Sequence, residues 1–570
     1  MMQSRLVAAC VAVAGLAQVS GGVEQTSQGT KPGATIAESF DGLGVGFEGP
    51  QGQSAVRNAS DNSLAVGPDH IMQTVNSRMA IFTKKGKKYA ETGKVLMGPV
   101  NNNTVFAGFT GACQATNNGD TVVRYDQLAD RWLITMPIFR PLPDRPDRPP
   151  QWQGDGTVYL APPGVSGQPG AAVLLTAPPP ASPSPSPTPS PSATASPTPS
   201  PAVSPTPTGS PAASPAPAGR GRAAGPPPLY AMCYAVSTSS DPLGTWYRYE
   251  FLRPLFPDYP RPAVWPDGYY TPTSTGDEVI QKHVCVADRA RMLKGEPATE
   301  QCVVIDGVNF LNTSDLDGKR LPPSGAPNII IAAGGTQLQK KFEDDAVFVW
   351  QLKVSWADPK KTRLTGPQRI AVAPYHYLCN GQLTNCVPQP GTERRLDAQG
   401  DKIMARSVYR NLGNRESLVA VHSVDTAAGG GGVRWYELQI GGRDRAVSLR
   451  QQGTYAPDGF FRWMASPAID KDGNIGIGYS FGGTPHFAGQ RFAGRLANDP
   501  LGKLTLAEVV LAEGAAAQTS TNRWEDYSQT AVDPSDDCTI WYVGDYYKAG
   551  ATTYSTRIGG FRMPGCGTRR

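Results

Sequence analysis

Five aspartates occupy the same place in a unit that recurs along the sequence, and they are the residues best placed for chemistry. Each unit opens with an acidic or polar residue, runs to an apolar position, passes a turn rich in Asp, Pro or Gly, and enters a second apolar strand. The aspartates at the unit starts are Asp61, Asp120, Asp258, Asp401 and Asp526. If these side chains meet in space, their charges repel one another and require cations, Arg partners or raised pKa values.

Three interpretations of these aspartates stay open. The first is a site for Ca²⁺ or for a polyhydroxylated ligand, because carboxylate oxygens bind both. The second is an acid/base pair for glycoside cleavage. In the third, each aspartate caps its own turn or binds the backbone of a neighbouring unit, and no shared site exists.

Arg-Trp dipeptides are a second set of candidates, and the sequence contains four of them, at 131–132, 434–435, 462–463 and 523–524. Adjacent residues on a strand face opposite ways, so the two side chains of each pair lie in different surroundings. In one interpretation the Trp packs between sheets and the Arg bridges to a carboxylate. In the other, an exposed Trp stacks on a sugar and an Arg holds an anionic group. On the second interpretation Arg434, Trp463 and Arg523 are candidate ligand-binding residues.

Glu416, His422 and Glu437 lie on strands that are close in sequence, so an acid/base role is one hypothesis for them. The other is that His422 is a structural histidine, which a single buried His more often is. No residue is assigned as catalytic on the sequence alone.

The spacing of the units predicts the fold. Asp61 and Asp120 are 59 residues apart, and the units that begin at 401, 464 and 526 are separated by 63 and 62 residues. A degenerate unit is expected around residues 328–335 and 346–350. Seven units of roughly 60–85 residues predict an all-β chain folded as a seven-bladed β-propeller, with six or eight blades as alternatives. The first strand of each blade then lines a central channel, and the unit-initial residues meet at one mouth of it.

Composition supports short strands and excludes several functions. The 570 residues include 63 Gly and 54 Pro, which favour turns over long helices. A net charge of +5 without a basic stripe gives no reason to expect a nucleic-acid partner. The sequence has no Gly-x-Ser-x-Gly elbow, P-loop or His-Glu-x-x-His motif.

A segment rich in Pro, Ser and Thr at 177–228 interrupts the repeats. It lacks apolar side chains to bury and is expected to be a disordered, extended loop. The strands around 131–137 and 230–237 are expected to pair, which makes the segment an insertion in one blade. The propeller would then comprise residues 38–176 and 229–566.

Residues 1–21 have the pattern of a secretory signal peptide, with one positive charge, an apolar run and small residues. No later apolar run reaches the length of a membrane span. We therefore expect a secreted monomer, extracellular or periplasmic.

Eight cysteines follow Cys10, and an even number in an exported chain indicates disulfides. A metal site is the weaker alternative, because no Cys-x-x-Cys spacing occurs and no His lies in ligand register. Of about 105 possible pairings, short loops favour Cys379–Cys386 and Cys285–Cys302. Cys538–Cys566 would hold the C-terminus, which leaves Cys113–Cys233.

The repeat cores resemble those of exported bacterial β-propeller proteins of unknown function. The stretches that carry this resemblance are 65–68, 125–132, 256–260, 432–437, 453–459 and 523–528. More distantly, the turns at 470–473 and 533–541 resemble the Asp-box turns of sialidase-type propellers, although neither matches the full Ser-x-Asp-x-Gly-x-x-Trp pattern. The resemblance implies a fold and export, and it implies no known chemistry.

We expect a non-catalytic propeller that binds an extracellular carbohydrate or protein partner at one face. The alternatives are a sialidase-like glycoside hydrolase that uses the carboxylates of the channel mouth, and an envelope-associated structural protein. Calcium is the one cofactor that clustered carboxylates suggest.

Overall fold

The computed structural model describes residues 23–143, 158–161, 165–166 and 229–567, apart from positions 55, 254, 275–281, 306, 309, 336–341, 382–384 and 405. The described chain is all-β, and its helices are single turns such as α1 (Ala112–Ala115) and α2 (Arg289–Met292). The predicted signal peptide and the insertion at 177–228 lie outside the described residues.

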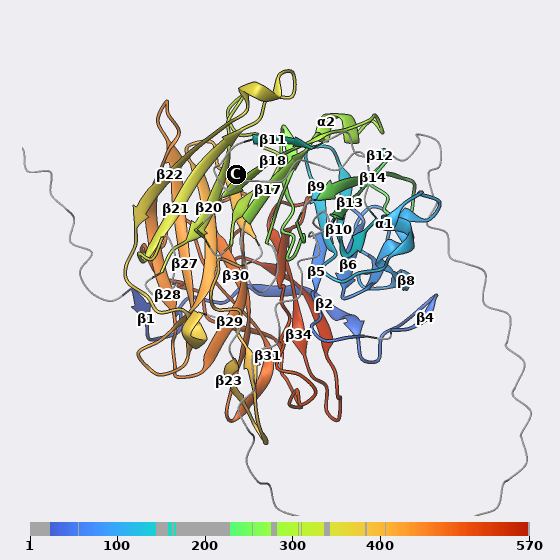
Figure 1. The fold of residues 1–570 in the computed structure, drawn as a ribbon. Helices are drawn as coiled ribbons and strands as arrows, with labels where there is room; N and C mark the ends of the chain where they lie inside the picture. Colours follow the sequence, from blue (N-terminus) through green and yellow to red (C-terminus); the bar gives the residue numbers. More distant parts are fainter. Residues whose placement is uncertain are drawn as a thin grey trace, which may run out of the picture.

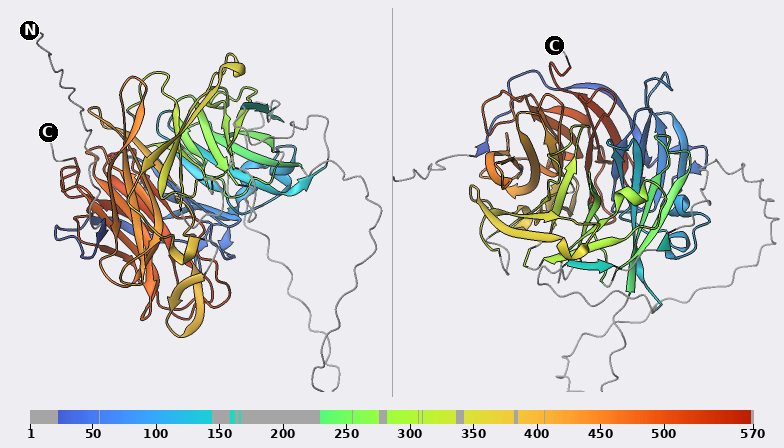
Figure 2. Two further views of the ribbon diagram at one scale, coloured as in Figure 1. Left: turned by 60° about the vertical axis from the view of Figure 1, so that its left-hand side comes forward. Right: turned by 90° about the horizontal axis from the view of Figure 1, so that it is seen from above.

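The antiparallel sheets follow one another in chain order around a propeller-like ring (Figures 1 and 2). The first sheet contains β5 (Ser63–Val66), β6 (His70–Val75), β7 (Arg78–Thr83) and β8 (Val95–Asn101). The second contains β9 (Val122–Asp126), β10 (Arg131–Leu142), β13 (Leu229–Ser237), β14 (Trp246–Arg253) and β12 (Val165–Ser166). The third contains β15 (Ala263–Trp265), β16 (Gly268–Thr273), β17 (Lys282–Ala287), β18 (Glu300–Ile305) and β11 (Val158–Ala161).

A 13-stranded sheet continues the ring and consists of three antiparallel runs. Parallel pairing of β19 with β25, and of β27 with β29, joins these runs. The first run is β19 (Asn312–Leu316), β20 (Asn328–Ala333), β21 (Ala346–Lys353) and β22 (Arg363–Ala371). The second is β25 (Ser407–Asn411), β26 (Glu416–Asp425), β27 (Gly431–Gly441) and β28 (Ala446–Tyr455). The third is β29 (Phe461–Ile469), β30 (Ile475–Gly483), β31 (His486–Arg495) and β32 (Val509–Ala512).

The ring closes between the two ends of the chain. The last sheet contains β33 (Gln529–Val532), β34 (Thr539–Tyr546), β35 (Ser555–Arg562) and the N-terminal strand β2 (Thr35–Gly44). Another N-terminal strand, β1 (Glu24–Gln25), pairs in parallel with β28. Two hairpins lie off the ring, β3 (Glu48–Gly49) with β4 (Gly52–Gln53) and β23 (Asn385–Gln389) with β24 (Thr392–Asp397).

The first strands of neighbouring sheets hydrogen-bond to one another through side chains around the centre of the ring. The Ser63 hydroxyl on β5 donates to Gln529 Oε1 on β33 at 2.7 Å and accepts from the Val123 N–H on β9 at 3.1 Å. These inner strands are short and almost wholly buried. The large apolar side chains pack farther out, between the sheets, and Trp435, Trp463 and Trp524 belong to the largest such cluster.

The degenerate unit expected around 328–335 and 346–350 was assigned to the wrong place within its sheet. These residues form β20 and β21, and the inner strand that precedes them is β19. The sequence of β19, Asn-Thr-Ser-Asp-Leu, lacks the apolar run that marks the other units, because the Asp315 side chain on it binds two arginines near the axis. A pattern based on apolar residues therefore overlooks this strand.

The four predicted disulfides are present: Cys113–Cys233, Cys285–Cys302, Cys379–Cys386 and Cys538–Cys566. The predicted pairing across the insertion is also confirmed, since β10 and β13 are antiparallel with Leu142 opposite Leu229. Among the described helices, none is long and apolar enough to span a membrane.

Because β10 and β13 pair on either side of the insertion, replacing residues 178–228 with a short Gly-Ser linker should leave the fold intact. Loop-closure entropy changes only logarithmically with length, so we expect the melting temperature to stay within about 2 °C of that of the full chain. Differential scanning calorimetry measures this. A loss of cooperative unfolding would contradict the pairing of these two strands.

Gln73 on β6 links the first sheet to the closing sheet. Its Oε1 accepts from the Leu43 N–H at 2.8 Å, and its Nε2 donates to Thr556 Oγ1 at 2.8 Å. Replacing Gln73 with Ala leaves a buried N–H without its partner and should lower the free energy of unfolding by about 2–3 kcal/mol. Urea denaturation tests this, with Gln28→Ala at an exposed position as the control. Equal stabilities of the two variants would show that Gln73 does not hold the closure.

Candidate functional site

The unit-initial aspartates lie at the entrances to the inner strands, beside a stacked pair of tyrosines. The rings of Tyr259 and Tyr527 are 4.3 Å apart. The Tyr527 hydroxyl donates to Asp120 Oδ2 at 2.9 Å, and the Tyr259 hydroxyl donates to the Asp526 carbonyl at 2.7 Å. Asp61 joins this group, because its Oδ2 accepts from the Asp120 N–H at 3.4 Å. We call this group the channel mouth; it comprises Asp61, Asp120, Asp258, Tyr259, Arg261, Phe310, Gln399, Asp401, Lys402, Arg523, Asp526 and Tyr527.

A shared backbone conformation explains why aspartate recurs there. Asp61, Asp120 and Asp526 have φ angles of 47°, 55° and 66°, and each precedes an inner strand by two or three residues. Asn and Asp tolerate this left-handed region better than most residues do. Tyr259 and Gln399 adopt the same conformation, with φ of 50° and 48°. The turn into the inner strand therefore accounts for the residue type, as the third interpretation of the aspartates requires.

Asp61 and Asp120 form a buried pair of carboxyl groups. Burial raises the pKa of Asp61 well above its usual value, and the charge of Asp120 raises it further. Burial also raises the pKa of Asp120. The contact between the two side chains also favours the protonated form of Asp61.

The other unit-initial aspartates have partners of their own. Asp401 Oδ1 lies 2.8 Å from Lys402 Nζ, and Asp526 pairs with Arg523. Asp258 exchanges backbone hydrogen bonds with Ser274. Asp401 and Asp526 are therefore each paired with a cation of the protein, and no ion pair of this kind is present for Asp61 and Asp120 among the described residues.

Arg261 is the exception in the channel mouth, because its guanidinium is buried without a hydrogen-bond partner among the described residues. Its side chain is 2% exposed, and Nε and both Nη atoms lack acceptors. It lies 5.0 Å from the ring centres of Tyr259 and Phe310, and Lys402 lies 4.3 Å from the Phe310 ring. Burial lowers the pKa of Arg261 to about 10. Aromatic faces therefore stabilise this cation in place of hydrogen bonds.

A second acid pair, Glu525 and Asp545, lies behind the channel mouth. Glu525 Oε1 accepts from the Asp545 N–H at 2.6 Å, and Asp545 Oδ1 accepts from Asn62 Nδ2 at 3.0 Å. The Glu525 carbonyl accepts from the Asp61 N–H at 2.7 Å, which joins the two acid pairs. Burial raises the pKa of Asp545 to about 8 and that of Glu525 well above its usual value. Sequence reasoning missed this pair; its signal is a charged residue within the otherwise apolar strand β34.

The centre of the ring is filled by an ion network that sequence reasoning also missed. Asp315 Oδ2 lies 3.2 Å from Arg124 Nε and 2.8 Å from Arg406 Nε. Arg406 also pairs with Asp317 at 2.7 Å. The cavity among these residues has a volume of about 20 Å³, which is room for one water molecule and not for a sugar.

Two of the predicted ligand-binding residues lie away from the channel mouth. Arg434 is buried and donates to Thr454 Oγ1 at 2.8 Å and to the Ala373 carbonyl. Trp463 is fully buried in the largest apolar cluster, so it offers no surface to a sugar. The interpretation in which Trp packs between sheets is the correct one for Trp463. Arg523, in contrast, is 62% exposed at the channel mouth.

Glu416, His422 and Glu437 do not converge on a site either. Glu416 binds Arg445 at 2.6 Å, and Glu437 accepts from the Ser417 hydroxyl at 2.7 Å. His422 is buried against Tyr436, whose hydroxyl lies 2.9 Å from Nε2, and burial lowers the pKa of this histidine to about 3. His422 is therefore a neutral structural residue at physiological pH.

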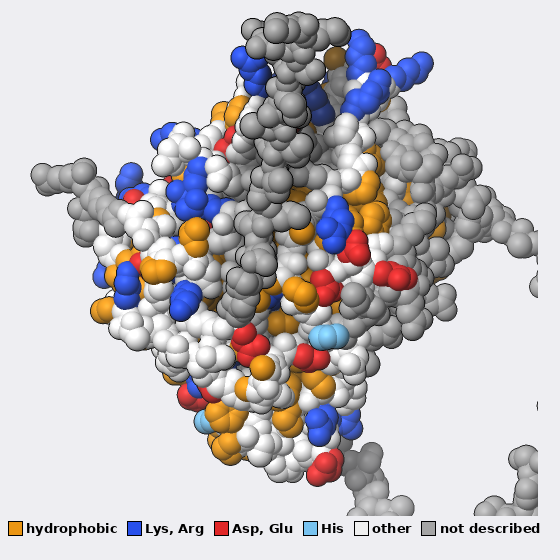
Figure 3. Space-filling model, turned by 90° about the vertical axis from the view of Figure 1, so that its left-hand side faces the viewer, with side chains coloured by type: hydrophobic (Ala, Val, Ile, Leu, Met, Phe, Trp, Pro, Cys, Tyr) orange, Lys and Arg blue, Asp and Glu red, His pale blue; other side chains and the backbone are white. Residues whose placement is uncertain are grey.

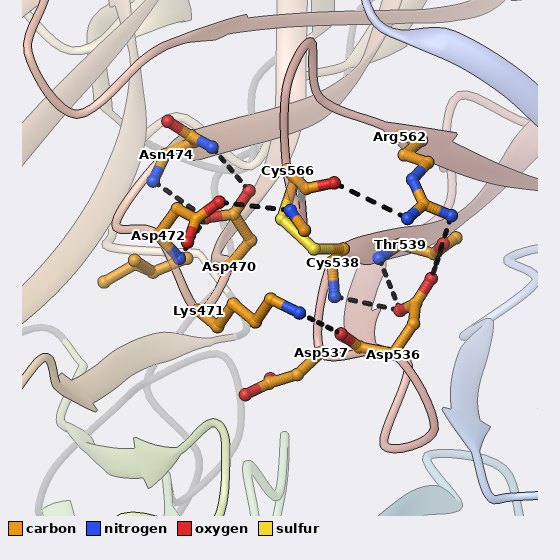
Figure 4. Close-up of a disulfide and its surroundings, with 12 residues drawn as sticks. Asp470, Lys471, Asp472, Asn474, Asp536, Asp537, Cys538, Thr539, Arg562 and Cys566 are labelled. Atoms are coloured by element: carbon orange, nitrogen blue, oxygen red, sulfur yellow. Dashed lines mark hydrogen bonds and ion pairs between the residues drawn. A yellow bond between two sulfur atoms is a disulfide. The ribbon is translucent and has the colours of Figure 1, made fainter. Parts of the chain in front are cut away.

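The two Asp-box-like turns are built as structural turns. Asp470 Oδ1 accepts from the N–H groups of Asp472 and Asn474 at 3.0 and 2.9 Å. Asp536 accepts from the N–H groups of Cys538 and Thr539, each at 2.9 Å. Figure 4 shows the Cys538–Cys566 disulfide between these turns.

The structure brings together two sets of His, Cys, Asp and Glu atoms densely enough for a metal ion, one around Cys285 and Cys302 and one around Cys538 and Cys566. Both sets rely on disulfide-bonded cysteines. A cysteine in a disulfide has no thiolate to offer a metal. Neither set is therefore a metal centre in the oxidised protein.

An open depression lies beside the channel mouth, against the hairpin formed by β23 and β24. Its volume is about 570 Å³. The lining residues are Asn385, Thr392, Glu393, Arg394, Arg395, Thr519 and Asn522. Asn522 precedes Arg523 of the channel mouth, and its carbonyl accepts from the Asp397 N–H at 2.8 Å. We call this feature the hairpin depression; no sequence pattern indicated it.

Elsewhere, charges of both signs are scattered over the surface. The face in Figure 3 shows Lys and Arg interspersed with Asp, Glu and small apolar areas. This mixture favours neither a nucleic acid nor a membrane surface on that face.

Comparisons with known proteins give little beyond the geometry. No protein-family model and no curated protein sequence matches the chain. Among solved structures, the chain is similar to a protein of unknown function from Dyadobacter fermentans DSM 18053. The two are 10% identical, the match covers 93% of this chain and 100% of that one, and the TM-score is 0.34.

The second acid pair predicts that stability falls as pH rises. The folded state keeps Asp545 protonated up to about pH 8, whereas the unfolded chain releases that proton near pH 4. The contribution of Asp545 to the free energy of unfolding is therefore largest below about pH 4. It declines between pH 4 and 8 by up to about 1.4 kcal/mol per pH unit for each proton.

Asp545→Asn should flatten this decline, and urea denaturation from pH 4.5 to 8.5 measures it. The control is Asp344→Asn, whose side chain is largely exposed. An unchanged slope in Asp545→Asn would show that the carboxyl is ionised in the folded protein.

Proposed function

We propose that this protein is an exported, seven-bladed β-propeller that binds an extracellular carbohydrate or protein partner without cleaving it. The binding site in this proposal is the hairpin depression, which lies beside the channel mouth. Seven antiparallel runs, each with an inner strand, support the blade number. Four disulfides support export, because such bonds persist in oxidising compartments.

The hairpin depression is the observation that carries the proposal. Its 570 Å³ can hold part of a glycan or a peptide loop, whereas the 20 Å³ at the ring centre cannot. Hydrogen-bonding side chains line it, and within the described part of the chain no aromatic or large apolar residue does. Such a lining suits a polar ligand that is held by hydrogen bonds.

The carboxyl geometry favours binding over hydrolysis. A glycosidase needs two carboxyl groups about 5–9.5 Å apart in an open pocket. Asp61 and Asp120 instead hydrogen-bond to each other in a buried position, while Asp401 and Asp526 are held by Lys402 and Arg523. The hypothesis of a binding protein predicts carboxylates that each have a partner of their own.

A glycan array probed with the mature protein, with and without Ca²⁺, tests the proposal. We expect binding to at least one polysaccharide class, unchanged by EDTA, and no release of reducing sugar from it. A protein partner would appear instead as saturable binding to an extracellular protein fraction, lost after that fraction is treated with protease.

Asp120→Asn combined with Asp526→Asn should leave this binding in place, because the hairpin depression does not contain either residue. Hydrolysis by the unaltered chain that the double substitution abolishes would overturn the proposal in favour of a glycosidase. Absence of any carbohydrate or protein ligand would overturn it as well.

A further inference from the structure

The hairpin depression carries positive charge without acidic partners. Arg394 and Arg395 are exposed on β24, and neither forms an ion pair with any described residue. Each is oriented by one hydrogen bond to a neutral acceptor. Arg394 Nη1 donates to Asn522 Oδ1 at 2.6 Å, and Arg395 Nη1 donates to the Cys386 carbonyl at 3.2 Å.

A single hydrogen bond leaves most of each guanidinium unused. Arg has five N–H donors in a planar fork that matches a carboxylate through two parallel hydrogen bonds. Because one donor already fixes the orientation of each side chain, less rotamer entropy is lost when an anion binds. Arg523, which is 62% exposed, follows Asn522 and extends the positive charge toward the channel mouth.

The hairpin is held rigidly enough to keep these side chains in place. The Cys379–Cys386 disulfide ties β23 to the turn at residues 378–381 that precedes it. Gln389 Oε1 accepts from the Gln518 N–H at 2.7 Å, and Gln389 Nε2 donates to the Gln518 carbonyl at 2.9 Å. The lining from both segments, the hairpin and residues 519–522, therefore forms one surface.

The neutral residues of the depression narrow the class of ligand. Asn385, Thr392, Thr519 and Asn522 offer amides and hydroxyls, and none of the described residues contributes an apolar side chain to the depression. A peptide partner ordinarily buries an apolar or aromatic anchor in such a pocket. A uronic acid instead has a carboxylate surrounded by hydroxyls, which matches two arginines surrounded by amides and hydroxyls.

We propose that the hairpin depression binds a carboxylated polysaccharide, with Arg394 and Arg395 holding uronate carboxylates and Asn522 and the threonines holding hydroxyls. This inference rests on the proposed binding function and names its ligand class. Glu393 at the edge disfavours a denser anion such as a sulfated chain.

Biolayer interferometry with immobilised polygalacturonate tests this inference on the full mature chain. Arg394→Gln combined with Arg395→Gln should raise the dissociation constant about tenfold, which corresponds to the loss of two partly screened charge-assisted contacts. The matched control, Arg363→Gln with Arg369→Gln on β22, makes the same change in net charge and should bind like the unaltered chain. Replacing both hairpin arginines with Lys should restore only part of the affinity, because an ammonium group lacks the planar fork.

Dextran, dextran sulfate and poly-L-glutamate are the comparison ligands. We expect weaker binding to all three than to polygalacturonate, and an affinity that falls with added salt. Equal affinity of the hairpin and control variants, or tighter binding of poly-L-glutamate, would overturn the inference. Binding of a neutral glycan with the same affinity to the hairpin variant and to the unaltered chain would overturn this inference and leave the proposed function standing. Absence of any ligand would overturn both.

Discussion

Burial of charge at the axis is the constraint on which the rest of the ring depends. Arg124, Asp315 and Arg406 lie where the inner strands meet, and none of them has access to bulk water. A buried charge is tolerated only when it is paired and hydrogen-bonded, so these residues must come from different sheets and arrive in register. Arg406 also donates to the Thr530 carbonyl at 3.0 Å, which joins the closing sheet to this network.

The channel mouth meets the same constraint by a different route. There the carboxyl groups exceed the cations that contact them, and burial raises the pKa values of Asp61, Asp120, Glu525 and Asp545, which favours their protonated forms. Both pairs lie where the closing sheet meets the first sheet, beside the hydrogen bonds of Gln73. Closure of the ring and protonation of these acids are therefore linked, because their desolvation is complete only when the two ends of the chain have met.

Structural residues can thus be distinguished from residues that are available to a ligand. Some residues serve the packing of the protein itself. These are the aspartates, the buried tryptophans and His422, and each contacts other residues within the protein. The hairpin formed by β23 and β24 is an addition to the ring. Its two arginines form one hydrogen bond each and no ion pair with a described residue. Side chains that are oriented by the fold but not neutralised by it are the ones that a ligand can use.

The sequence by itself determined the short strands, the propeller-like repetition, the disulfide pairing and the pairing of strands across the Pro-rich insertion. It could do so because these depend on periodicity, turn residues and loop length, which are local properties. It also placed Asp61, Asp120 and Asp526 at the entrances to inner strands, where each adopts a left-handed turn.

Only the tertiary structure decided what those residues touch. The sequence analysis did not identify β19 as an inner strand, because its polar residues pair with arginines from other sheets. Trp463 lies in the core because adjacent sheets cover it. The closure by β2, the contact between Glu525 and Asp545, and the hairpin depression each join segments that lie more than a hundred residues apart or on separate elements. Contacts of that kind are fixed by how the sheets close on one another, and no local pattern in the chain records them.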